Sequence, residues 1–173
     1  MRAAGLLALA AAAATGAHAQ ETPNATPLDP VVVSATRVNR PSFELPISID
    51  SVSGDSIREG QATVNLSESL ARVPGLVIQN RQDYAQDLQI SSRGFGARTQ
   101  FGVRGVRLVA DGIPATQPDG QGQAASFDLG SAKSIEVMRG PFSTLYGNAS
   151  GGVIQVFTED GPARPVLEAD ACA

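Results

Sequence analysis

The sequence predicts an α+β domain, a small mixed β-sheet of about four or five strands with short helices. Short runs with alternating apolar and polar residues, typical of half-buried strands, recur between residues 46 and 158. Glycines and prolines separate these runs. Residues 66–73 instead have the apolar spacing of a helix. The hydrophobic fraction of 42% suits a buried core, so we expect one domain at residues 43–160, preceded by a signal peptide and a flexible tail.

Residues 1–19 have the pattern of a secretory signal peptide. Arg2 supplies a positive start, and residues 3–14 form an apolar run that is too short to span a bilayer. Ala17-His18-Ala19 then matches an A-x-A cleavage site. The sequence therefore predicts export to the periplasm or beyond.

Residues 20–42 are predicted to form a flexible periplasmic tail. Its first part, residues 20–30, contains three prolines and no apolar periodicity. A short β-prone run follows, with no neighbouring partner strand expected: Val31, Val32, Val33, Ser34 and Ala35. A segment of this kind on a mobile tether can add a strand to the sheet of another protein. The alternative is that it forms an ordinary first strand of the domain.

The helix expected at residues 66–73 has the clearest boundaries. Asn65 is a favourable N-cap, and Glu68 stands three residues later, where it completes a capping box. Leu66, Leu70 and Val73 follow at helical spacing, and Pro74-Gly75 ends the pattern. The other expected elements in this half are a helical turn at 53–59, a buried extended segment at 76–78, and strands at 46–50, 88–91 and 106–110.

The C-terminal part predicts two strands that are joined by a short helical turn. Ile135 and Val137 alternate with polar neighbours, as on a half-buried strand, until Gly140-Pro141 ends the run. Residues 142–146 can form one helical turn, and Gly151-Gly152 releases the chain into a strand at 153–158. Residues 161–173 are predicted to be an unstructured, truncated end.

The residue inventory gives no support to an enzyme, a metal site or a cofactor. The single histidine, His18, lies in the predicted leader, and the single cysteine is Cys172. Zinc sites and histidine-dependent triads therefore lack their ligands and bases. Residues 120–125 fit G-x-G-x-x-A, but a proline-rich loop precedes them instead of a strand. The net charge of −4 gives no reason to expect nucleic-acid binding.

Several motifs resemble the plug domain of TonB-dependent outer-membrane receptors. They are Arg93-Gly94-Phe95, Leu108–Pro114, Val137–Pro141, Leu145-Tyr146-Gly147 and Gly151–Ile154. The resemblance covers roughly residues 31–158. It implies a plug that gates energised uptake of a scarce ligand such as a ferric siderophore, with the plug in a β-barrel lumen and the tail in the periplasm. It also identifies residues 31–35 as a TonB box, the segment that binds TonB.

The resemblance further implies two sets of plug residues. Arg93 and Arg139 are expected to pair with glutamates on the inner barrel wall; the alternative is that both are surface charges. The polar loop at 115–125 is expected near the ligand path, through Gln117, Asp119, Gln121 and Gln123; an ordinary solvated loop is the alternative.

The residues after Thr158 would supply one strand at best, so we expect this chain to be a receptor fragment without its barrel. As a fragment it would reside in the periplasm and could not transport. The alternative function is a freestanding periplasmic binding or interaction domain.

Overall fold

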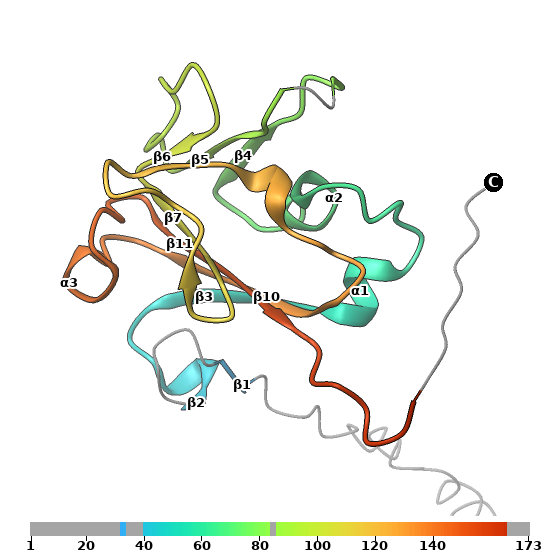
Figure 1. The fold of residues 1–173 in the computed structure, drawn as a ribbon. Coiled ribbons are helices and arrows are strands. Elements are labelled where there is room, and N and C mark those ends of the chain that lie inside the picture. Colours follow the sequence, from blue (N-terminus) through green and yellow to red (C-terminus); the bar gives the residue numbers. More distant parts are fainter. Residues whose placement is uncertain (1–31, 34–39, 84–85, 166–173) are drawn as a thin grey trace, which may run out of the picture.

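The computed structural model describes residues 32–33, 40–83 and 86–165. The predicted signal peptide, most of the predicted tail, and Val31, Ser34 and Ala35 lie outside these residues, as do residues 166–173. Figure 1 shows the arrangement of the described elements.

A mixed five-stranded sheet forms the centre of the domain, as the sequence predicts (Figure 1). The pairing of β11 with β7 is parallel, whereas all other pairs in this sheet are antiparallel. In spatial order, the strands are β3 (Ser48–Ser53), β10 (Ala132–Arg139), β11 (Gly152–Thr158), β7 (Val106–Ala110) and β8 (Ile113–Pro114).

The remaining strands form three small antiparallel pairs. They are β1 (Val32–Val33) with β2 (Arg40–Pro41), β4 (Leu76–Gln79) with β5 (Gln89–Ser92), and β6 (Val103–Arg104) with β9 (Gln121–Gly122). Val32 faces Pro41 and Val33 faces Arg40. The expectation that the 31–35 run has no partner strand is therefore wrong for these two valines.

The helices are short, as expected. They are η1 (Ser42–Glu44), α1 (Gly54–Arg58), α2 (Leu66–Leu70), η2 (Ala124–Ser126) and α3 (Ser143–Tyr146). The predicted capping box is present at α2. Asn65 accepts a hydrogen bond from the Ser67 N–H at 3.0 Å, and the Glu68 carboxylate accepts one from the Asn65 N–H. The helix ends at Leu70, yet Val73 remains buried in the following turn.

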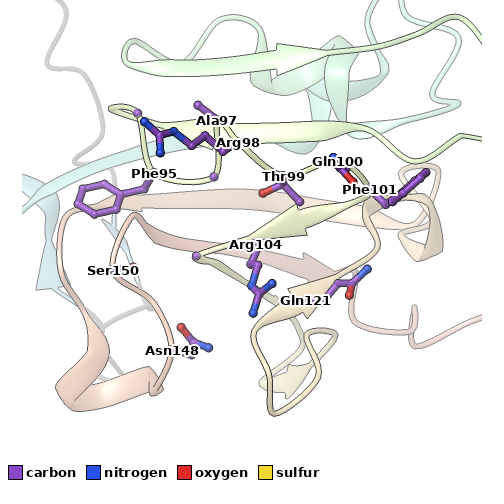
Figure 2. Close-up of a pocket in the computed structure, with 13 residues that line it drawn as sticks. Phe95, Ala97, Arg98, Thr99, Gln100, Phe101, Arg104, Gln121, Asn148 and Ser150 are labelled. Carbon is purple, nitrogen blue, oxygen red and sulfur yellow. The ribbon is translucent and has the colours of Figure 1, made fainter.

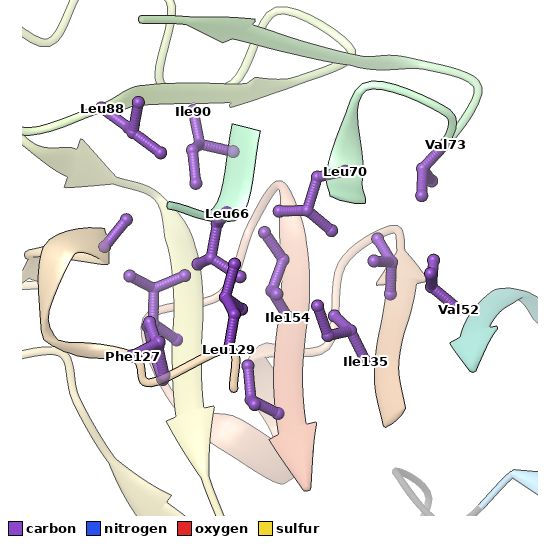
Figure 3. Packing of buried hydrophobic residues seen from close by; sticks show 14 of the residues in the cluster. Val52, Leu66, Leu70, Val73, Leu88, Ile90, Phe127, Leu129, Ile135 and Ile154 are labelled. Atoms are coloured by element: carbon purple, nitrogen blue, oxygen red, sulfur yellow. The ribbon is translucent and has the colours of Figure 1, made fainter. Parts of the chain in front are cut away.

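The main core lies between the central sheet and α1 and α2. Figure 3 shows Leu66 and Leu70 packed toward Ile135 and Ile154 of the sheet, and all four side chains are fully buried. A smaller cluster covers the opposite face, where Met138 and Val153 contact the segment that contains α3. The expectation that the strand carrying Ile135 is half-buried is therefore wrong, because both of its faces are covered.

One extended segment is less buried than expected. Residues 76–78 do form a strand, β4, but Val77 is 56% exposed. The reason is that β4 pairs with β5 in a two-stranded sheet, so only Leu76 and Ile78 turn toward the main core.

Candidate functional site

An open pocket of about 840 Å³ lies where the 94–101 loop meets the β6–β9 pair. The loop forms one wall. Arg104 on β6, Gln121 on β9, and Asn148 and Ser150 on the segment after α3 complete the lining (Figure 2). Arg104 and Gln121 face each other in the β6–β9 register. Asn148 stands beside them, because a Cβ added at Gly120 would meet its side-chain amide nitrogen. The pocket thus joins four segments of the chain.

Close backbone approaches hold the 94–101 loop in place. Gly96 has a φ of +85°, and a Cβ there would lie 2.7 Å from the Arg104 carbonyl oxygen and 2.9 Å from that of Ile90. Glycine is therefore the residue that both this conformation and this spacing require. On the other side, the Gln89 side-chain amide donates to the carbonyls of Ala97 and Thr99 at 2.9 and 2.8 Å. The loop is thus anchored on β5.

The pocket lining is cationic and partly aromatic. Arg98 and Arg104 are exposed, and neither forms an ion pair within the described ranges of the chain. Phe95 is 50% exposed and Phe101 is 74% exposed. None of the lining residues is acidic. Such a surface can bind an anion and stack against a flat ring.

The structure brings together the two arginines that were predicted as plug contacts. Both flank the Pro74-Gly75 turn: a Cβ at Gly75 would lie 3.6 Å from Nη1 of Arg139 and 4.0 Å from Cγ of Arg93. Arg93 has a φ of +50°, and its N–H donates to the Gly75 carbonyl at 3.1 Å. Arg93 is exposed to solvent.

Arg139 is engaged inside the domain. It forms a 2.5 Å ion pair with Asp50 on β3 and donates a 2.6 Å hydrogen bond to the Pro74 carbonyl. Its side chain is 15% exposed, and its Nε has no hydrogen-bond partner among the described groups. Asp50 is a partner that the sequence reasoning did not identify. The β3–β10 register places Asp50 opposite Val137, two residues from Arg139, so the ion pair runs diagonally across the two strands.

The predicted ligand loop is ordered by its own hydrogen bonds. The Gln117 N–H donates to the Gln121 carbonyl at 2.8 Å, and the Asp119 carboxylate accepts from the Gln121 N–H at 3.0 Å. All four predicted residues are exposed, but Gln121 is the one that lines the pocket; Gln117, Asp119 and Gln123 do not.

Several pocket residues were missed by the sequence reasoning: Arg98, Thr99, Phe101, Arg104 and Asn148. The closely spaced glycines from Gly94 to Gly105 were the available signal, since they indicate an irregular loop with close backbone contacts.

Two kinds of feature are absent from the described residues. No helix there is long and apolar enough to cross a membrane, and no three His, Cys, Asp or Glu side chains gather in a way that could hold a metal ion.

Comparison with known proteins identifies the relatives of this fold. Residues 41–153 match the TonB-dependent receptor plug domain family. The hemin receptor of Yersinia enterocolitica is 32% identical over 89% of this chain and 21% of its own length. The vitamin B12 transporter of Vibrio vulnificus is 32% identical over 82% of this chain and 22% of its own length. The chain thus spans about a fifth of these curated relatives.

The solved structures agree in fold. The ferric enterobactin receptor of Pseudomonas aeruginosa, in complex with enterobactin, matches with a TM-score of 0.50 and 22% identity, over 69% of this chain and 18% of that chain. The family match covers most of the chain and confirms the resemblance seen in the sequence. The chain therefore belongs to the TonB-dependent receptor plug domain family.

Proposed function

We propose that this chain is the plug of an outer-membrane TonB-dependent receptor and gates the energised uptake of a scarce ligand, such as a ferric siderophore. The plug would fill the lumen of a β-barrel domain, with the 20–42 tail in the periplasm. The observation that carries the proposal is the family match over residues 41–153, which includes all of β3, β7, β8 and β10 and the start of β11. The exposed, pre-formed pocket supplies a surface for the ligand.

TonB is the proposed periplasmic partner, and residues 31–35 are its proposed contact. β1 and β2 form a two-stranded sheet, so each strand pairs along one edge. The other edge of β1 suits strand addition, in which backbone hydrogen bonds provide the affinity. β1 and β2 are each two residues long, so few backbone hydrogen bonds between them would compete with a partner strand.

Arg93 and Arg139 are the proposed contacts with carboxylates of the barrel wall. The buried Nε of Arg139 has no hydrogen-bond partner among the described groups. Arg93 is exposed on the same side of the domain, next to the Pro74-Gly75 turn. A guanidinium has five N–H donors, so Arg139 can pair with Asp50 and still donate a hydrogen bond to a second carboxylate.

The proposed function is tested through TonB. The full chain and a variant with residues 31–35 deleted are mixed with the C-terminal domain of TonB, and complex formation is measured by pull-down and titration. We expect the deletion to abolish binding. A matched deletion of residues 23–27, in the same tail, should leave binding unchanged. Equal binding of TonB by both deletion variants would show that the 31–35 assignment is wrong.

A further inference from the structure

A second pocket lies on the face of the central sheet that the α3 segment covers. It has a volume of about 410 Å³ and shares no lining residue with the larger pocket. Its lining includes Arg107 and Val109 of β7, Gln155 of β11, Pro114 of β8 and Leu145 of α3. The pocket volume is in the range of small-molecule sites.

Gln155 brings an unpaired polar group to this pocket. The residue is only 7% exposed, and its side-chain Oε1 has no hydrogen-bond partner among the described groups. An unpaired buried carbonyl oxygen is unfavourable, because it has lost its contact with water without gaining a donor. A ligand with an N–H donor would satisfy this oxygen.

Arg107 supplies the complementary group. It is half-buried and forms no ion pair within residues 40–83 and 86–165. The parallel β7–β11 register pairs Gln155 with Val109, so Arg107 is a diagonal neighbour of Gln155 on the same face of the sheet. Glu136 lies opposite Gln155 on β10 but does not line the pocket, and no other acidic residue lines it. The lining thus combines one cation with one unpaired acceptor.

We infer that this pocket binds a small carboxylate that has an N–H donor beside the charge and an apolar side chain. Arg107 donates to the carboxylate, since its guanidinium pairs bidentately with anionic oxygens. Gln155 Oε1 accepts from the N–H, and the apolar group packs against Val109 and Leu145. Acylated amino acids and peptide C-termini share this chemistry. The inference goes beyond the proposed receptor function and does not depend on it.

The test titrates the isotope-labelled full chain with N-acetyl-leucine and follows binding by NMR. The methyl ester of this probe lacks the charge, and N-acetyl-N-methyl-leucine lacks the N–H donor. We expect the probe to bind at least about tenfold more tightly than either analogue and to shift the side-chain amide resonance of Gln155. A parallel titration with N-acetyl-Gly-Gly-Leu identifies the source. Tighter binding of this peptide indicates a peptide C-terminus, whereas tighter binding of N-acetyl-leucine indicates an acylated amino acid.

Two variants separate the two contacts. Gln155→Leu removes the acceptor at similar volume, so it should abolish the preference over the N-methylated analogue and keep the preference over the ester. Arg107→Gln should have the opposite effect on the two preferences, and Arg107→Lys should keep much of the preference over the ester. Arg164→Gln removes an exposed arginine outside the pocket and should change neither preference.

Three results would each overturn the inference: no saturable binding of N-acetyl-leucine or the peptide, equal affinity for the probe and both analogues, or an equal loss in Arg164→Gln. The comparison of the probe with its analogues uses the wild-type chain alone, so it decides the question even if a variant fails to fold. The TonB experiment is independent. Failure of TonB binding would count against the receptor function, whereas equal probe affinities would count against this pocket alone.

Discussion

The ion pair between Asp50 and Arg139 offers the sharpest test of the described packing. Replacing Asp50 with asparagine removes the charge but keeps the shape of the side chain. Arg139 would then lose its charged partner while its side chain is 15% exposed, and its hydrogen bond to the Pro74 carbonyl would remain. Breaking a fully buried pair costs about 3–5 kcal/mol. Because the Asp50 side chain is 30% exposed, we expect a smaller loss, about 2 kcal/mol in the free energy of unfolding.

Urea unfolding, followed by circular dichroism, measures this loss. With a slope of about 1–3 kcal/mol/M for small proteins, the unfolding midpoint should fall by roughly 1 M. Asp55→Asn is the matched control, because Asp55 also faces an arginine, Arg58 at 3.6 Å, but its side chain is 98% exposed. That variant should change stability by less than about 0.5 kcal/mol. If both asparagine variants shift the midpoint equally, the proposed role of burial at Arg139 is refuted.

Three further predictions concern other parts of the domain. Gly96→Ala should lower the free energy of unfolding by at least about 2 kcal/mol, because the added Cβ would collide with two carbonyl oxygens. Its control is Gly94→Ala, where the glycine has a φ of +88° but open space around it, and this variant should cost about 1 kcal/mol in the same urea assay. Equal losses in the two variants would contradict the clash at Gly96. Leu70→Ala should cost about 2–5 kcal/mol, measured by thermal unfolding, because the side chain is fully buried, and a loss under 1 kcal/mol would contradict the described core. Lys133 donates a hydrogen bond to Asp160, which lowers the pKa of Asp160 and raises that of Lys133. Asp160→Asn should therefore reduce stability slightly at neutral pH. The stability difference between the wild type and this variant should vanish as the pH falls through the lowered pKa of Asp160, and also as it rises through the raised pKa of Lys133. A stability difference that persists in acid would contradict the ion pair.

Local features were predictable because neighbours in the sequence determine them. The capping box of α2 needs Asn65 and Glu68 at one spacing, and both hydrogen-bond as predicted. Asp-Gly is a typical residue pair for a turn with positive φ, and Asp111 and Gly112 have φ values of +47° and +82°. The β10–β11 hairpin around α3 likewise follows from one contiguous stretch.

The pocket was not predictable in this way. Its lining comes from the 94–101 loop, β6, β9 and the segment after α3, and no spacing in the sequence connects these four. The predicted ligand loop contributed Gln121 alone, because register in the β6–β9 pair brings that residue opposite Arg104. Gln117, Asp119 and Gln123 lie outside the two-residue strand β9 and do not line the pocket.

The sequence by itself determined the family, the α+β class and the approximate positions of the longer strands and of α1, α2 and α3, because motifs, caps and glycine turns act over a few residues. The tertiary structure decided which distant groups meet. It placed Asp50 against Arg139 through the β3–β10 register, and it covered the second face of β10 with the segment containing α3. It also gathered Arg98 and Arg104 in one pocket. The physical reason is that strand register and close contacts at glycines bring residues that are far apart in the sequence to within a few ångströms of each other. Patterns of neighbouring residues contain no information about these long-range contacts.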